Sequence, residues 1–373
     1  MSEWIKTKLG EIVILNYGKA LKAQDRNPGS IPVYSSGGLT GWHDKALINE
    51  HGIIVGRKGT VGKVYLTYKP FWCIDTAYYI LPNPSKYDFV FLFYLLKTLG
   101  LEELNEDSAV PGLNRDTAYS QEILLPSLPE QKSIAAVLSS LDNKIDLLHR
   151  QNKTLESVAE TLFRQWFILD DTDTSVSIDQ IIDFNPKRTL TKSQDATYLD
   201  MAGLSTDIFR ATGYYKRPFS SGTKFTKQDT LLARITPCLE NGKAAYIDFL
   251  DENETGWGST EFIVMRPKKE IHPMISYIMC RNPDFKEYAE SCMEGSTGRQ
   301  RVNLDYLKKF NVNLPTEASL RKINELLDSF ESKLINNSKQ IDSLEKIRDT
   351  LLPKLMSGEV RVQYAEEAIA SVA

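Results

Sequence analysis

The sequence predicts an α+β protein in which two mixed α/β domains are separated by a long antiparallel two-helix coiled coil, with a pseudo-twofold internal repeat. Three observations predict this fold: a length of 373 residues, a repeat offset by about half the chain, and two sustained heptad patterns. The length alone exceeds the usual size of one domain. The predicted parts are a first domain at 1–128, a first helix at 129–168, a second domain at 169–315, a second helix at 316–357 and a tail at 358–373.

The internal repeat relates the two halves of the chain. Ser108–Asn114 corresponds to Thr297–Asn303, an offset of 189 residues. Leu125-Pro126 matches Leu314-Pro315 at the same offset, and the segments that follow match without a gap. Self-similarity at a fixed offset is typical of duplicated architectures. Each copy therefore consists of a variable globular segment followed by a regular helical segment.

Both globular segments contain short apolar runs bounded by turn residues, which is typical of strands. In the first segment we expect strands at 53–55, 64–66, 75–80 and 122–125, and an apolar helix at 89–99. In the second segment we expect strands at 231–235, 244–247, 261–265 and 311–314, and a helix at 274–281. This mixture places both domains in the mixed α and β class.

The regular segments carry apolar residues at alternating four- and three-residue steps, a 3.5-residue period that is typical of coiled coils. The seam of the first helix comprises Ile134, Leu138, Leu141, Ile145, Leu148, Asn152, Leu155, Ala159, Leu162 and Trp166. The seam of the second comprises Ile323, Leu327, Phe330, Leu334, Asn337, Ile341, Leu344, Arg348, Leu351 and Leu355. Each seam spans 33 residues, which corresponds to about 50 Å of helix. If domains at the two ends of such a helix pair read DNA, half-sites about one helical turn apart, roughly 34–36 Å, would lie within this span.

Each seam contains one asparagine, Asn152 in the first helix and Asn337 in the second. Because the ends of a domain usually lie close together, the chain should leave the second domain near its point of entry, which makes the helices antiparallel with one domain at each end. Centring the seams on each other then places the two asparagines face to face. We predict that they hydrogen-bond and fix direction and register at some cost in stability. The alternative is two independent, partly solvated polar positions.

The loop at 56–63 concentrates three cations among three glycines. These cations are Arg57, Lys58 and Lys63. Glycines let the backbone approach a phosphate closely, and Arg or Lys side chains reach phosphate oxygens or guanine edges. A nucleotide-binding phosphate loop is one rival interpretation, but Gly56 and Gly62 enclose five residues instead of four, and Val64 replaces the required Ser or Thr. The other rival interpretation is a glycine hairpin that is only solvated.

Further polar side chains in comparable turns are candidate nucleic-acid contacts. In the first domain they are Ser35, Ser36, Asn114 and Arg115. In the second domain they are Arg234, Asn241, Lys243, Arg299, Gln300 and Arg301. The last three form the densest cluster, whereas their counterparts Val110, Pro111 and Gly112 are uncharged. The two halves are therefore expected to read different sequences.

The charge balance argues against an extensive phosphate-binding surface. The net charge is −4; residues 1–128 carry 13 basic and 13 acidic side chains, and residues 170–316 carry 19 and 21. Proteins that neutralise phosphates usually show a basic excess. Basic groups must therefore cluster locally, or partner subunits must supply part of the affinity.

Other classes of protein find little support. The four cysteines form no Cys-x-x-Cys pair, and none of the four histidines lies near a cysteine in zinc-ligand spacing, so neither a disulfide framework nor a metal site is indicated. The chain has no apolar run long enough to span a membrane and no signal peptide at its start, so a cytoplasmic protein is expected. An adenine methyltransferase needs an Asn-Pro-Pro-aromatic motif, but Asn185-Pro186 continues as Lys187-Arg188 and Asn83-Pro84 as Ser85-Lys86. We expect no catalytic residues.

The sequence resembles the specificity subunits of type I restriction–modification systems over nearly its whole length, most specifically in the helices. The segments that carry the resemblance are 56–63, 110–115, 125–135, 141–145, 155–167 and 351–360. They include Leu125-Pro126-Ser127-Leu128-Pro129-Glu130-Gln131-Lys132 and Leu351-Leu352-Pro353-Lys354-Leu355-Met356-Ser357-Gly358. The globular segments vary within the family, so base-contacting residues do not follow from it.

The resemblance implies a function and a set of partners. Each globular domain would be a target-recognition domain that reads one half of a split target in double-stranded DNA, and the helices would set the unread spacer. Two methyltransferase (modification) subunits would dock on the helical region, and restriction subunits would join them. S-adenosylmethionine and ATP would bind those partners, and this chain would need no cofactor. A structural coiled-coil scaffold without DNA sequence specificity is the alternative.

Overall fold

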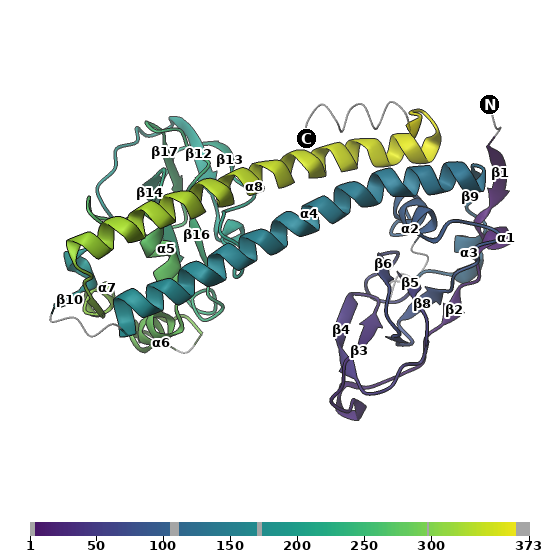
Figure 1. The fold of residues 1–373 in the computed structure, drawn as a ribbon, viewed down its shortest axis with the longest axis horizontal. Coiled ribbons are helices and arrows are strands. Elements are labelled where there is room, and N and C mark those ends of the chain that lie inside the picture. The colour runs from purple at the N-terminus through teal and green to yellow at the C-terminus, as the bar shows by residue number, and fades with distance from the viewer. Residues whose placement is uncertain (1–3, 105–111, 170–173, 297, 363–373) are drawn as a thin grey trace. The chain divides into compact units, whose positions relative to one another are not determined.

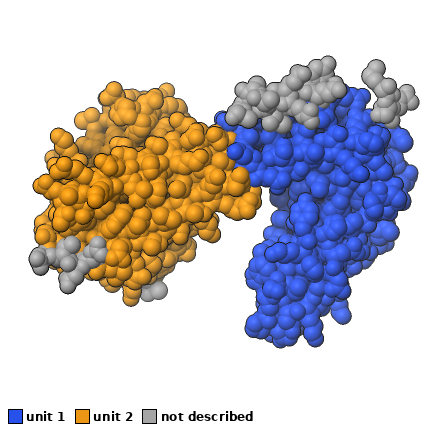
Figure 2. Space-filling view, in the orientation of Figure 1, with its two compact units in different colours: residues 1–145, 342–373 blue, residues 146–341 orange. Residues whose placement is uncertain are grey.

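The computed structural model describes residues 4–104, 112–169, 174–296 and 298–362. The chain forms two compact units, residues 1–145 with 342–373 and residues 146–341, shown in blue and orange in Figure 2. Two long helices, α4 (Leu128–Phe163) and α8 (Glu317–Ser357), contribute to both units (Figure 1). We call the globular part of the first unit domain 1 and that of the second domain 2. The repeat residues 108–111 and 297, and the tail from 363 onward, lie outside the described residues.

Domain 1 is built on two sheets and a closing strand pair. The larger sheet has the order β2-β8-β5-β6, comprising Asn16–Tyr17, Ala77–Ile80, Gly52–Gly56 and Val64–Thr67. The smaller has the order β4-β3-β7, comprising Gly38–His43, Ile31–Ser35 and Trp72–Cys73, with β3 and β7 parallel. The closing pair is β1 (Ile5–Lys8) with β9 (Glu122–Leu125). The helices are α1 (Leu9–Ile12), η1 (Ala23–Asp25), α2 (Phe89–Thr98) and α3 (Arg115–Tyr119).

Domain 2 repeats this plan with longer connections. Its first sheet has the order β11-β18-β15-β16, comprising Ile182–Phe184, Phe262–Pro267, Thr230–Ala233 and Ala244–Tyr246. Its second has the order β13-β12-β17-β14, comprising Tyr215–Pro218, Asp195–Leu199, Thr255–Gly258 and Thr223–Thr226. Two further pairs are β10 (Ser175–Ser177) with β21 (Asn311–Asn313) and β19 (Met293–Glu294) with β20 (Arg301–Val302). The helices are η3 (Ile178–Gln180), η4 (Met201–Gly203), α5 (Met274–Arg281), α6 (Pro283–Ser291) and α7 (Leu304–Leu307).

The shared sheet order confirms the internal repeat at the level of topology. The sheet β2-β8-β5-β6 of domain 1 and the sheet β11-β18-β15-β16 of domain 2 have corresponding strands in the same order, and a strand pair closes each domain beside the following helix. The sequence predicts the central strands of these sheets. It does not predict the second sheet of either domain. In domain 1, β7 is two residues long and β4 contains two glycines, which weaken the strand pattern.

Antiparallel segments of the two long helices form part of the core of each unit. In the first unit, Arg348 of α8 donates to Asp142 of α4 (3.0 Å) and Arg361 pairs with Glu130, so residue numbers rise along one helix as they fall along the other. The buried seam residues there are Ile134, Leu138, Leu141, Leu351 and Leu355, packed against α2. Burying each such side chain stabilises the fold by roughly 1.5–3 kcal/mol.

In the second unit the asparagines meet across the helix pair. The Nδ2 atom of Asn337 donates to Oδ1 of Asn152 (2.8 Å), and Asn337 is fully buried. The end of α4 differs from the predicted seam, because Phe163 and Phe167 are the most buried side chains there instead of Leu162 and Trp166. A straight α-helix drifts relative to a strict heptad, and the π-helical turn η2 (Arg164–Leu169) shifts the register further. Among the described residues, we find no helix with the length and apolar character needed to cross a membrane.

Candidate nucleic-acid interface

The β5–β6 loop of domain 1 holds Arg57 in a fixed position. Its backbone N–H donates to the carbonyl of Thr76 (2.9 Å), and its carbonyl accepts from Leu113 (2.8 Å). The guanidinium donates to the carbonyl of Asp75 (3.1 Å) and lies over the ring of Tyr17, 4.8 Å from its centroid. Cation–π stacking and the hydrogen bonds together pre-organise this cation at the surface.

Three other predicted residues lie beside Arg57. Lys58, Asn114 and Arg115 line one shallow hollow of about 340 Å³ with Arg57, two tyrosines and the acidic Asp116. Arg115 also lies over the Tyr17 ring (5.4 Å), so two guanidinium groups share one aromatic platform. Within the described part of the chain, Arg57, Lys58 and Arg115 form no ion pair with a carboxylate. Their charge is therefore available to an anionic ligand.

Asn114 has a structural role in this hollow. Its side-chain oxygen accepts hydrogen bonds from the backbone N–H groups of Asp116 (2.8 Å) and Thr117 (3.5 Å), which caps α3. In domain 2, Asn303 caps α7 in the same way by accepting from Asp305 (3.0 Å). The preference for asparagine at both positions is thus explained by helix capping.

Lys63, at the end of the same loop, has an acidic partner. Its ammonium donates to Glu102 (2.9 Å), and this hydrogen bond raises the pKa of Lys63. Both side chains are about half exposed, so the pair contributes little to stability. A phosphate at this position would compete with Glu102 for the ammonium.

The predicted serines form the turn between β3 and β4, which lies against the loop. The backbone N–H of Ser36 donates to Thr76 Oγ1 (3.3 Å), and Ser35 Oγ donates to the carbonyl of Gly38 (3.4 Å). A Cβ added to Gly56 would lie 2.0 Å from the carbonyl oxygen of Thr60 and 3.1 Å from that of Ser36. Glycine at position 56 is therefore required for this close approach.

The β15–β16 loop of domain 2 has the same backbone bracing. The N–H of Arg234 donates to the carbonyl of Glu261 (3.0 Å), and its carbonyl accepts from Val302 (2.8 Å). These bonds correspond to those of Arg57 with Thr76 and Leu113. Arg234 and Arg57 therefore occupy equivalent positions, and Val302 follows Leu113 at the repeat offset of 189 residues.

The charge of this second loop is partly neutralised within the domain. Arg301 makes a bidentate pair with Glu261 (2.7 and 3.0 Å), and Arg234 Nε lies 4.0 Å from the same carboxylate. The hydrogen bonds from Arg301 lower the pKa of Glu261. The predicted cluster at 299–301 thus offers one cation, Arg299, that is exposed and unpaired among the described residues, with Gln300 bonded through its backbone to Thr236.

The remaining predicted residues lie at the tip and end of this loop. Asn241 is exposed, and its backbone N–H donates to the carbonyl of Pro237 (3.0 Å). Lys243 is half-buried, and its ammonium donates to the carbonyl of Met201 (3.0 Å). Asn241 is therefore open to a ligand, whereas Lys243 is directed toward its own domain.

Sequence reasoning missed residues that share a groove with Arg234. The groove is lined by Asn185, Pro186, Arg188, Gly222, Thr223, Lys224, Arg234, Thr260 and Phe262. Its cations come from segments up to 46 residues apart in the sequence, Arg188 to Arg234. No local pattern predicts such a grouping, because folding alone brings the segments together.

Arg281 braces the β15–β16 loop from beneath and also escaped prediction. Its guanidinium donates to five backbone carbonyls, those of Ser205, Thr206, Ile208, Gly242 and Ala244, at 2.7–3.4 Å. Its Nε donates to the hydroxyl of Tyr277 (3.0 Å), which in turn donates to Glu156 on α4 (2.6 Å). One planar cation thereby links the loop to the long helix.

The carboxyl group of Glu156, at the end of this network, has a pKa well above its usual value. Burial raises the pKa of Glu156 to about 7, against the opposing effects of the Tyr277 hydrogen bond and the nearby Arg281 charge. The side chain lies in the interface between α4 and α5 with 9% of its residue surface exposed. Its protonation state therefore changes near neutral pH.

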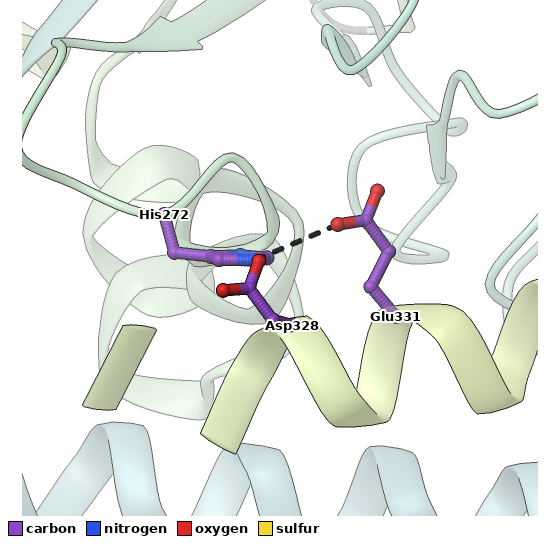
Figure 3. A group of neighbouring side chains, drawn as sticks. All are labelled: His272, Asp328 and Glu331. Carbon is purple, nitrogen blue, oxygen red and sulfur yellow. Dashed lines mark hydrogen bonds and ion pairs between the residues drawn. The ribbon is translucent and has the colours of Figure 1, made fainter. Parts of the chain in front are cut away.

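A second network connects domain 2 to α8. Figure 3 shows His272 beside Asp328 and Glu331 of α8. Its Nε2 lies 3.1 Å from a carboxylate oxygen of Asp328 and 3.5 Å from one of Glu331. These three groups could in principle hold a metal ion. However, Nδ1 accepts the backbone N–H of Met274 (3.2 Å), so Nε2 carries the ring proton and donates it to the carboxylates. Metal binding through Nε2 would break that backbone hydrogen bond, and the geometry therefore favours a hydrogen-bonded tie.

Comparison with known proteins places this architecture in a family. The family model described as the type I restriction modification DNA specificity domain matches residues 1–157 and again residues 172–346. The chain belongs to the type I restriction–modification specificity subunits. The two matches cover both halves of the repeat, and they confirm the resemblance drawn from the helical segments. Specificity subunits are non-catalytic, in agreement with the expectation of no catalytic residues.

Individual relatives support the assignment. The chain is 26% identical over 346 residues to the type I restriction enzyme MjaIX specificity subunit of Methanocaldococcus jannaschii, covering 83% of this chain and 78% of that subunit. It is 26% identical over 207 residues to the EcoEI specificity subunit of Escherichia coli, covering 51% of this chain but 34% of that relative's length. The crystal structure of a specificity subunit from M. genitalium matches with a TM-score of 0.62 and 21% identity over 95% of this chain and 96% of that one, which shows a shared fold.

Proposed function

We propose that this specificity subunit binds double-stranded DNA and reads a bipartite target, one half through each domain. The observation that carries the proposal is the pair of equivalent arginines, Arg57 and Arg234, held by the same backbone hydrogen bonds on corresponding loops. Arginine on a rigid loop can make a bidentate contact to guanine or bind a phosphate. The side chains around the two arginines differ, so the half-sites should differ in sequence.

The family and the charge balance support a proposal about the partners. We propose that two methyltransferase (modification) subunits dock on the helical region and that restriction subunits join them, with S-adenosylmethionine and ATP bound by these partners. The exposed apolar residues Leu147 and Val158 on α4, at 42% and 41% exposure, are candidate docking positions. Partner-supplied contacts with DNA would compensate for domains whose own charges nearly cancel.

Methylation mapping tests this function. The full chain is co-expressed with its modification subunits, and methylated adenines are mapped in the host DNA. We expect a split, asymmetric motif that is absent when the modification subunits are expressed alone. Lys6→Ala, which removes an exposed ion pair with Glu122 (2.7 Å), serves as the control and should leave the motif unchanged. Sequence-independent methylation by an assembled complex would support the scaffold alternative, and the absence of any chain-dependent methylation would contradict both.

A further inference from the structure

One face of the second sheet of domain 2 carries a continuous row of aromatic and basic side chains. Strand register places Tyr215, Tyr198, Trp257 and Lys224 opposite one another across β13-β12-β17-β14. Side chains that face one another across neighbouring strands lie on the same side of a sheet. Leu199, the neighbour of Tyr198, points to the other side, into the hydrophobic core.

The aromatic rings of this face are packed together. The centroid of Tyr198 lies 4.5 Å from Trp257 and 5.5 Å from Tyr215, and Phe219 lies 5.3 Å from Trp257 in an edge arrangement. Trp257 is 2% exposed, so the centre of the row is a solid platform. Rings packed in this way are fixed in position and can hold a cation above them in a defined place.

Two cations lie over the platform. The guanidinium of Arg217 lies 5.0 Å from the centroid of Tyr198 and 5.5 Å from that of Trp257, and the ammonium of Lys224 lies 4.9 Å from that of Phe219. In the described residues, neither cation pairs with a carboxylate. In a domain with more acidic than basic side chains, two pre-organised cations without acidic partners require an explanation.

The neighbouring residue on the same strand provides the contrast. Lys216 points to the opposite side of β13 and pairs with Glu254 (2.5 Å). The charge of Lys216 is therefore neutralised within the domain, although its side chain is exposed. Lys216 is a matched control for Arg217.

The face continues into the groove that contains Arg234. Lys224 lines that groove together with Arg188 and Arg234. Arg188 is partly neutralised by Asp229 (3.3 Å), and Arg234 is near Glu261, so Arg217 and Lys224 are the cations along this path with no carboxylate partner among the described residues. The path leads from the edge strand β13 to the loop for which base contacts are proposed.

We infer that Arg217 and Lys224 bind the phosphate backbone of duplex DNA beside the bases addressed by the β15–β16 loop. This inference rests on the proposed function of domain 2. Stacking of an unpaired base is disfavoured, because Trp257 is buried and the guanidinium of Arg217 covers the neighbouring ring. Phosphate contacts of this kind position a protein on DNA without reading sequence.

The described residues of domain 1 form no equivalent of this surface. Register places His43 of β4 where β13 has Arg217, and Trp72 where β17 has Trp257. His43 packs against the Trp72 ring (5.4 Å) but is 5% exposed, and its Nδ1 accepts from the backbone of Asn27 (3.1 Å). The position of the exposed Arg217 guanidinium in domain 2 is thus taken by a buried imidazole in domain 1, and Val33 stands where domain 2 has Tyr198.

The salt dependence of DNA binding tests the inference. The full chain is assembled with its modification subunits and mixed with a duplex that contains the motif found by methylation mapping. The binding constant K is measured between about 50 and 200 mM salt. Arg217→Ala with Lys224→Ala should reduce the slope of log K against log salt by about two and weaken specific and non-specific duplexes alike. Lys216→Ala should leave the slope unchanged, and Arg217→Lys should restore most of it.

The outcomes separate this inference from the proposed function. If the double variant is folded by circular dichroism and keeps the wild-type salt slope, the inference is overturned. The effect of Arg57→Ala on binding then still tests whether the complex reads DNA. Wild-type complex that binds no duplex overturns the proposed function itself. Loss of assembly with the modification subunits in the absence of DNA would show that the face binds protein, and it would also overturn the inference.

Discussion

The two domains hold their loops in the same way but surround them with different charges. In both, the loop arginine is fixed by one backbone donor bond and one backbone acceptor bond. The residue that accepts from this arginine immediately precedes a strand and is Thr76 in domain 1 and Glu261 in domain 2. Glu261 brings a carboxylate to Arg234 and Arg301, whereas Thr76 brings none to Arg57. The fold therefore conserves backbone geometry and leaves the local chemistry free to differ, as the proposed reading of two unlike half-sites requires.

The polar contacts that attach each domain to the helix that follows it are likewise shared in position and different in detail. Tyr94 of domain 1 donates to Asp142 of α4, and Tyr246 of domain 2 donates to Glu331 of α8, both at 2.6 Å. The two acidic residues are 189 residues apart, which is the repeat offset. Domain 2 has additional ties, through His272 to Asp328 and Glu331 on α8 and through Tyr277 to Glu156 on α4. Domain 2 should therefore be more sensitive to loss of polar contacts.

The largest expected effect follows from Arg281→Ala. The change removes a cation that satisfies five carbonyls of domain 2 and leaves them without that donor. We expect a loss of about 2–4 kcal/mol in the free energy of unfolding, with faster hydrogen exchange at residues 205–208 and 242–244. Lys286→Ala, which removes a half-exposed pair with Glu290 (3.8 Å), should cost less than about 0.5 kcal/mol. Equal exchange in the two variants would contradict the bracing role.

Protonation of Glu156 should make the stability of domain 2 depend on pH. Because the folded pKa of about 7 lies above the value of 4.5 for an unfolded chain, the folded state binds the extra proton between these values. Stability is then highest below about pH 4.5 for this group and is lost as pH rises through 7, by on the order of 2–3 kcal/mol. Glu156→Gln should remove that loss, which denaturant unfolding at pH 5.5 and pH 8 measures. A variant that keeps the full pH dependence would assign it to another group.

Sequence predicted the parts of this comparison that depend on local pattern. The heptad seams and the central strands follow from periodicity, and the loop cations Arg57 and Arg234 are visible as basic residues after a strand. The acidic partners are not visible, because Glu102 and Glu261 reach Lys63 and Arg301 only after folding brings together segments about 40 residues apart. One available signal went unused: Tyr214-Tyr215-Lys216-Arg217-Pro218-Phe219 interleaves aromatic and basic residues.

The two loop arginines should differ in their contribution to DNA binding. Arg57→Ala should weaken binding of the assembled complex by about 1–3 kcal/mol if Arg57 reads a base. Arg234→Ala should have a smaller effect, because Glu261 lies 4.0 Å from its guanidinium and already attracts part of its charge. Glu261→Gln should strengthen binding and enlarge the effect of Arg234→Ala in the double variant. Titration of each complex with its target duplex measures these constants, and equal losses in the two single variants would remove the proposed asymmetry.

The smallest expected effect concerns Asn152 and Asn337, which belong to the helix pair instead of either domain. Asn337 is fully buried, and its Oδ1 has no hydrogen-bond partner among the described residues. Replacing both asparagines with leucine should therefore raise the free energy of unfolding by about 1 kcal/mol, while removing the polar pair that favours one register.

Cysteine pairs can report the register directly. In the present register Leu148 and Ile341 have the same residue-number sum as the two asparagines, so Leu148→Cys with Ile341→Cys should cross-link in both backgrounds. Leu148→Cys with Leu334→Cys reports a slip of one heptad and should cross-link more readily after the asparagines are replaced. Unchanged stability and unchanged cross-linking would leave the asparagines as two ordinary polar positions, because a register lock that neither costs stability nor prevents slippage has no physical content.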